Sequence, residues 1–171
     1  MGCDIHWYSE TRRDGKWECD QKLTFVETDD DGWPDMDYFP DPDRDYYLFG
    51  LLNPSVRTEW VWSFPESSKV PEDVSREVSL IYDRWGVDAH SAGSLTRAEL
   101  KAKLEELKLL IAKALVVPRK DSQGMSHHKK CLMKILSNMT SDVPDEDQRI
   151  VFWFDTDRKS TRLNSSHAPL S

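Results

Sequence analysis

The sequence is short of the residues and segments that mark several protein classes. Its 171 residues include only three cysteines, Cys3, Cys19 and Cys131, and they form no Cys-x-x-Cys pair. Disulfide-stapled secreted domains need more cysteines, so we expect reduced thiols. The chain also lacks a secretory signal and any apolar run near the roughly 18–20 residues that cross a bilayer. These absences predict a cytoplasmic protein without a membrane partner.

Positive charge is also scarce, with 23 Lys and Arg against 31 Asp and Glu and a net charge of -8. This balance disfavours a nonspecific hold on nucleic-acid phosphates or anionic lipids. A local basic patch at 119–120 and 127–130 has no interleaved aromatic residues, which is typical of a solvated surface, so nucleic acid is not an expected partner. Phosphate-binding glycine loops and nucleophile elbows are absent too.

Aromatic residues, in contrast, are plentiful. Seven Trp, six Phe and five Tyr provide large buried areas. The chain length suits one domain. We therefore predict a single α+β domain over residues 1–156.

The last residues form a distinct segment. Asp157 to His167 resembles, residue for residue, one reading frame of a widely used sequencing adapter. Translated scars of this kind are excluded from fold reasoning. We expect residues 157–171 to be a non-natural, disordered tail.

Strand patterns occur at both ends of the chain. Residues 5–10 and 17–19 flank Asp14-Gly15, which predicts a hairpin with either a two-residue turn or a glycine bulge. Residues 149–155 predict a strand buried on both faces. In residues 59–64, Trp60 and Trp62 alternate like a strand, whereas residues 28–45 are rich in Asp and Pro and predict a loop.

Helical patterns lie between these strands. Thr96 and Glu99 form a capping box before a long helix that ends ahead of Pro118. Shorter helices are expected at residues 46–52, 75–85 and 129–139. The predicted fold is α+β, with a small, mainly antiparallel sheet that includes both chain ends and packs against two to three helices.

A few polar residues form a candidate site. Asp4 and His6 are two apart on a strand, so they share a face and could bind a metal or move a proton. His90, on an expected loop, offers a second imidazole, and Asp155 a further carboxylate. We predict Asp4, His6 and His90 as catalytic residues and all four as ligands of a divalent metal. The alternative is that they brace the sheet edge and cap a helix.

Two further motifs give weaker signals. Glu27-x-Asp29-x-Asp31-Gly32 resembles the opening of a calcium loop, but Tyr38 stands where a bidentate Glu should close it. A solvated acidic loop is the better interpretation. Cys3 lies near His6 in sequence, but with no visible activating arrangement it is better explained as a packed thiol.

Several segments together carry a family resemblance: Met1-Gly2-Cys3-Asp4-Ile5-His6, Asp14-Gly15-Lys16-Trp17, Arg44-Asp45-Tyr46-Tyr47-Leu48-Phe49, Pro71-Glu72-Asp73-Val74-Ser75, His90-Ser91 and Arg149-Ile150-Val151-Phe152-Trp153-Phe154-Asp155. With these the chain resembles a family of small uncharacterised proteins from phages and bacteria, which implies an origin and a host cytoplasm but no chemistry. Members often have a second His and a Trp where this chain has Ala92-Gly93, which weakens a site centred on His90.

Two functions follow as hypotheses. The first is a small phage-type accessory protein, an acidic module that binds a host or phage protein. The second is a metal-assisted hydrolase that uses Asp4, His6 and His90. The first is favoured because no catalytic signature is complete.

Overall fold

The computed structural model describes residues 2–26, 33–36, 39, 44–57, 59–113, 119–140 and 142–156. The adapter-like tail and the acidic opening of the calcium-loop resemblance, residues 27–32, therefore lie outside the described residues. Within the described part of the chain, no helix has the length and apolar character needed to span a bilayer.

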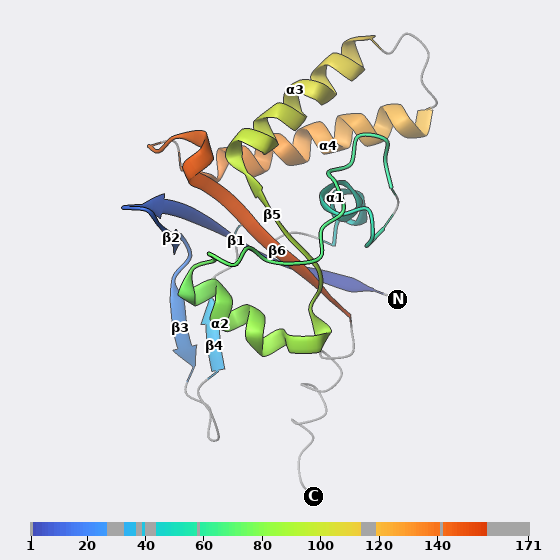
Figure 1. Cartoon of the computed structure of the whole chain (residues 1–171). Helices are drawn as coiled ribbons and strands as arrows, with labels where there is room; N and C mark the ends of the chain where they lie inside the picture. The colour runs from blue at the N-terminus through green and yellow to red at the C-terminus, as the bar shows by residue number, and fades with distance from the viewer. Residues whose placement is uncertain are drawn as a thin grey trace, which may run out of the picture.

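The centre of the fold is a four-stranded antiparallel sheet in the order β2-β1-β6-β5. Its strands are β1 (Cys3–Arg13), β2 (Lys16–Cys19), β5 (His90–Thr96) and β6 (Gln148–Thr156). The two chain ends pair side by side, from Cys3 opposite Thr156 to Thr11 opposite Gln148. Figure 1 shows β1 and β6 crossing the middle of the molecule. The predicted α+β class, with both ends in one antiparallel sheet, is confirmed.

The turn between β1 and β2 decides which of the two predicted hairpin geometries applies. Asp14 and Gly15 both have positive φ, at 50° and 76°, and Arg13 pairs with Lys16. Two successive positive φ values match a two-residue turn whose twist suits the strands. Consequently Trp17 lies opposite Arg12, on the face of the sheet that Asp4 and His6 share.

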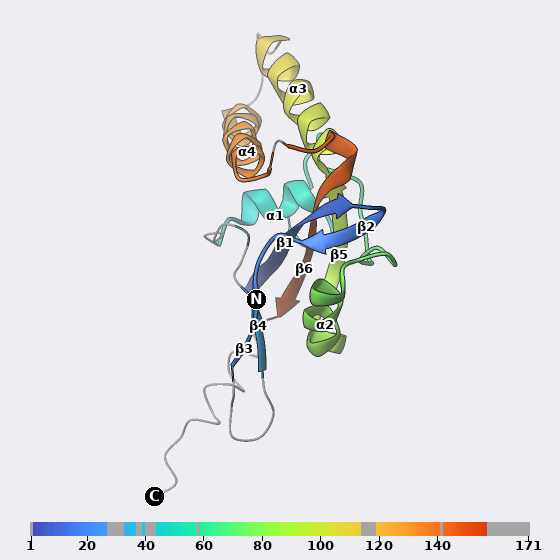
Figure 2. The same ribbon diagram turned by 90° about the vertical axis from the view of Figure 1, so that its left-hand side faces the viewer.

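In the part of the chain that the structure describes, four α-helices pack on the two faces of the sheet: α1 (Tyr46–Leu52), α2 (Arg76–Trp85), α3 (Arg97–Lys113) and α4 (Arg119–Ser137). The sequence predicts two to three helices against the sheet, so the structure adds at least one. Figure 2 shows α2 on one side of the sheet and α1 and α4 on the other. Single-turn 3-10 helices, η1 (Gly86–Asp88) and η2 (Asp145–Asp147), precede β5 and β6.

The core has two parts, one on each face of the sheet. Trp7, Phe152 and Phe154 belong to the larger cluster, which includes buried residues of α1, α3 and α4. Tyr8 and Trp153 belong to the smaller one, which α2 covers with Val78 and Ile81. Residues 148–155 of β6 are all buried, which confirms a strand buried on both faces.

Local side-chain caps set the starts of the helices. Ser75 accepts the Val78 N–H at the start of α2. Before α3, Glu99 accepts the Thr96 N–H at 2.8 Å and Thr96 accepts the Glu99 N–H at 3.1 Å. This is the predicted capping box.

Four predictions about elements were wrong. Residues 59–64 form a turn, with Trp60 and Trp62 buried and stacked 5.3 Å apart rather than alternating along a strand. His90 begins β5 instead of lying in a loop. Helix α4 starts ten residues before the expected 129, so Gly124 is helical. Within the expected loop at 28–45, β4 (Trp33–Met36) pairs with β3 (Leu23–Val26).

Candidate functional site

Two of the residues predicted from the sequence meet on the α2 face. His6 Nε2 lies 2.6 Å from Asp155 Oδ2, and both side chains are buried. Asp4 is directly opposite Asp155, so His6, two residues further on, reaches it diagonally across the strand pair. The His6 ring lies 4.2 Å from that of Trp85 and 5.9 Å from that of Trp153. The hydrogen bond between His6 and Asp155 is therefore buried beside two aromatic rings.

The other two predicted residues are held elsewhere. Asp4 is half-exposed and pairs with Arg44 at 2.8 Å. His90 lies opposite Phe154, and its ring stacks on that residue at 6.4 Å, on the face away from His6. The sheet thus separates the two histidines. Asp4, His6, His90 and Asp155 do not converge into a shared metal site within the described residues, where the three-ligand group lies at another place.

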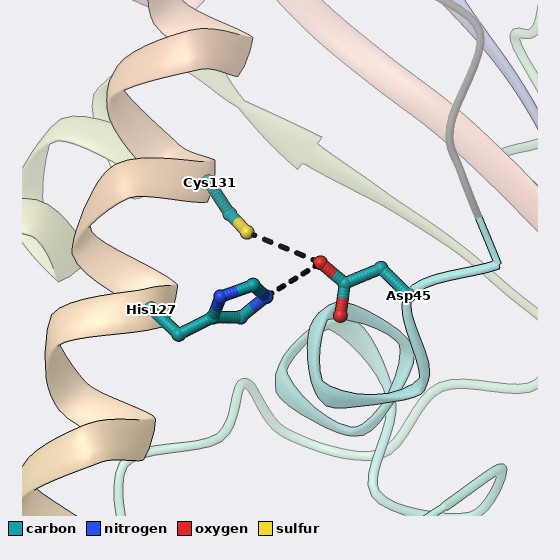
Figure 3. Close-up of side chains that lie close together, drawn as sticks. All are labelled: Asp45, His127 and Cys131. Carbon is teal, nitrogen blue, oxygen red and sulfur yellow. Dashed lines mark hydrogen bonds and ion pairs between the residues drawn. The ribbon is translucent and has the colours of Figure 1, made fainter.

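That group is Asp45, His127 and Cys131. One ligand atom from each residue lies within 4.8 Å of the other two. Asp45 Oδ2 is 2.6 Å from His127 Nε2 and 3.5 Å from Cys131 Sγ. Figure 3 shows the imidazole and the thiol of α4 directed at this one carboxylate.

The start of α1 positions Asp45. It is the N-cap of the helix, and its Oδ1 accepts the Leu48 N–H at 3.0 Å. This capping bond fixes the carboxylate and leaves Oδ2 for the side chains of α4. His127 and Cys131 are four residues apart on α4, so both point from the same side of that helix.

His128 holds α4 against α1 beside the site. Its Nδ1 accepts the indole N–H of Trp62 at 2.9 Å, and its Nε2 lies 2.8 Å from the carbonyl of Tyr47. An indole N–H can only donate, so the proton of a neutral His128 is on Nε2 and bonds Tyr47. The side chain is fully buried, and that burial is the main cause that lowers its pKa. A neutral imidazole therefore anchors the helix that carries His127.

The electrostatic setting differs among the three ligands. Burial raises the pKa of Asp45, but hydrogen bonds from Leu48 and His127 outweigh it, so the pKa is lowered. Burial, followed by the charge of Asp45, raises the pKa of the Cys131 thiol to about 12. The His127 side chain is 46% exposed, so the group opens to solvent on that side.

The donor set suits a divalent transition metal. Carboxylate oxygen, imidazole nitrogen and thiolate sulfur together favour ions such as Zn²⁺ over Ca²⁺ or Mg²⁺. Around a tetrahedral zinc, sulfur and oxygen ligands lie about 3.5 Å apart, and nitrogen and oxygen about 3.3 Å. The observed Cys131–Asp45 distance of 3.5 Å fits. The 2.6 Å between His127 and Asp45 must widen slightly, which a half-exposed imidazole allows.

Sequence reasoning missed this group. The only local signal was His-x-x-x-Cys at 127–131, and it was overlooked because the helix was expected to begin at 129. Asp45 is 82 residues from His127, so only the packing of α1 on α4 brings them together. A scan of known protein families, a search of curated proteins and a search of solved structures each found no match.

Proposed function

We propose that this protein binds a divalent transition-metal ion, with zinc the best fit, through Asp45 Oδ2, His127 Nε2 and Cys131 Sγ. The observation that carries the proposal is that one carboxylate oxygen faces both an imidazole nitrogen and a sulfur from another helix. Three protein ligands leave one coordination position open, as in zinc sites that bind a further ligand. The metal component of the hydrolase hypothesis thus moves to residues other than Asp4, His6 and His90.

Support also comes from how the ligands are held. Asp45 is oriented by its capping bond to Leu48, and His127 directly precedes His128, which is hydrogen-bonded to Tyr47 of α1. Ligands that are fixed by such outer hydrogen bonds bind metal with less loss of entropy. An ion at this position would also cross-link α1 to α4 and stabilise the folded chain as far as it binds the native state alone.

The test is metal content and affinity, measured on the full chain purified without a histidine tag. After zinc loading and removal of free metal, elemental analysis should find one equivalent. The variants Asp45→Asn, His127→Ala and Cys131→Ser should each weaken binding by more than the roughly 10–100-fold that loss of an outer-shell partner costs. Circular dichroism should show that each variant remains folded.

Matched controls use the same residue types at other places. Asp4→Asn, His90→Ala and Cys19→Ser remove a carboxylate, an imidazole and a thiol outside the group, and zinc binding should be unchanged. Because Asp4 and His90 are two of the four metal ligands predicted from the sequence, these controls also test that prediction. Metal lost from them and kept in the Asp45 and His127 variants would reverse the assignment. An absence of bound metal in the wild type would refute the proposal.

The acidic interaction module remains a sequence-based prediction. It rests on the net charge of -8, and a host or phage protein stays its expected partner. Metal binding and partner binding are compatible because they use different features of the chain. We rank metal binding above partner binding because the structure brings three specific ligand atoms together, whereas the partner-binding surface is defined only by net charge.

A further inference from the structure

The face of α4 that carries His127 and Cys131 also carries two lysines. Lys130 follows His127 by three residues, and Lys134 follows Cys131 by three. The four residues are therefore at i, i+3, i+4 and i+7, the spacing of one helix face. Both lysines are exposed, and neither ammonium forms an ion pair with a described residue.

Lys134 is close enough to influence the centre. Burial is the main cause that raises the pKa of Cys131, and the charge of Lys134 acts in the opposite direction. A dication bound by one carboxylate and one thiolate is neutral as a whole. The two ammonium groups, on the same helix face as His127 and Cys131, then give that face a charge of about +2.

We propose that the open coordination position of the metal binds a phosphate-type anion, with one oxygen on the metal and the others facing Lys130 and Lys134. The inference rests on the proposed metal site. A phosphate monoester, like the hydrogen phosphate dianion, has three oxygens without a proton and a charge of about -1.5 to -2 at pH 7, so it can contact the ion and two ammonium groups together. A carboxylate has two oxygens and a single negative charge, so it cannot contact the metal ion and both ammonium groups with separate oxygens. Lysine is a common point-charge partner of phosphate.

The experiment uses the full chain with cobalt(II) in place of zinc, freed of excess metal. Cobalt bound to sulfur and nitrogen has visible absorption bands that change when its fourth ligand changes. Titration with inorganic phosphate should shift these bands with a single saturable transition. A second titration with phenyl phosphate tells whether the site accepts a phosphate monoester or only the free ion.

The variants separate recognition from metal binding. Lys130→Ala/Lys134→Ala should keep stoichiometric cobalt and weaken phosphate binding about tenfold or more. The single variants Lys130→Ala and Lys134→Ala are each matched by Lys129→Ala, which removes one positive charge from another face of α4 and should leave phosphate affinity within about twofold. Because each single variant in the comparison loses one positive charge, a difference in phosphate affinity between them does not come from net charge alone.

The outcomes are distinct. If the wild type binds no cobalt, the metal proposal and this inference both fail. Bound cobalt with bands that phosphate leaves unchanged would overturn only the inference, as would equal weakening in the three single variants Lys130→Ala, Lys134→Ala and Lys129→Ala. Saturable binding that depends on Lys130 and Lys134 would support it.

Discussion

Glu10 and Arg149 lie directly opposite each other on β1 and β6 and form a buried ion pair. Glu10 Oε2 accepts the Arg149 Nε–H at 2.9 Å, and the same oxygen lies 2.8 Å from Arg149 Nη2. The Glu10 side chain is fully buried and that of Arg149 is 7% exposed. Glu10 Oε1 also accepts the backbone N–H of Ser75 at 2.8 Å. One carboxylate thus joins the two chain ends to the start of α2.

We expect Arg149→Met to destabilise the fold strongly. The substitution leaves Glu10 as a buried charge without its partner, which typically costs about 3–5 kcal/mol. The double variant Glu10→Gln/Arg149→Met removes both charges and should recover most of that loss. Free energies of unfolding from denaturant titration measure both effects.

Arg12→Met is the control, because Arg12 also pairs with a carboxylate, that of Asp147, but at the surface. Exposed pairs contribute about 0–1 kcal/mol. A loss in Arg149→Met no larger than that in Arg12→Met would mean that the buried pair contributes little to stability.

The features that the sequence predicted well depend on neighbours along the chain. The Thr96–Glu99 capping box and the Asp14-Gly15 turn form from residues one to three positions apart, so local rules sufficed. β6 was predicted from its unbroken apolar run, because a strand with one exposed face would alternate apolar and polar residues. These elements fixed the class and the central pairing of the sheet.

The features that were missed depend on tertiary contacts. Trp60 and Trp62 alternate like strand residues, but each is buried by stacking in a turn, where Trp62 bonds His128. β5 contains His90, Ser91 and two small residues, so it lacks a strand-like apolar pattern and is held by pairing with β6. In the candidate site, Asp45 and Cys131 are 86 residues apart, and no local pattern relates them.

Gly124→Ala tests whether packing outweighs helix propensity in α4. In a helix interior, alanine is favoured over glycine by about 1 kcal/mol. Here the new Cβ would lie 2.7 Å from the Trp60 ring, which is buried in a stack between Tyr47 and Trp62. Overpacking of this kind costs about 1–3 kcal/mol, which exceeds the propensity gain, so we expect a net loss of stability of up to about 2 kcal/mol.

Ser126→Ala provides the comparison on the same helix. Ser126 is exposed, so alanine should bring its propensity gain without a steric cost and leave stability equal or slightly higher. Thermal unfolding of the two variants beside the wild type measures the difference. An increase in stability for Gly124→Ala would show that the Trp60 ring moves aside at little cost.

Asp73 should make stability depend on pH in the acid range. Its Oδ1 accepts an Arg149 N–H at 2.9 Å, and its Oδ2 accepts the Trp17 indole N–H at 3.0 Å. Slight burial raises the pKa of Asp73, but the hydrogen bond and charge of Arg149 lower it more, so the folded pKa lies below the usual 3.8. The carboxylate therefore stabilises the fold above that value, and the effect is lost as pH falls through the folded pKa.

We expect Asp73→Asn to lower the free energy of unfolding by up to about 1 kcal/mol between pH 5 and 7, since the side chain is largely exposed. The difference from the wild type should shrink as pH drops below about 4, because the wild-type carboxyl then becomes neutral too. Glu72→Gln changes an exposed neighbour that has no ion pair with a described residue, so it should have little effect at any pH. Urea titrations at successive pH values give the curves. A difference for Asp73→Asn that stays constant down to pH 2.5 would show that the amide loses a contact other than the charge pair with Arg149.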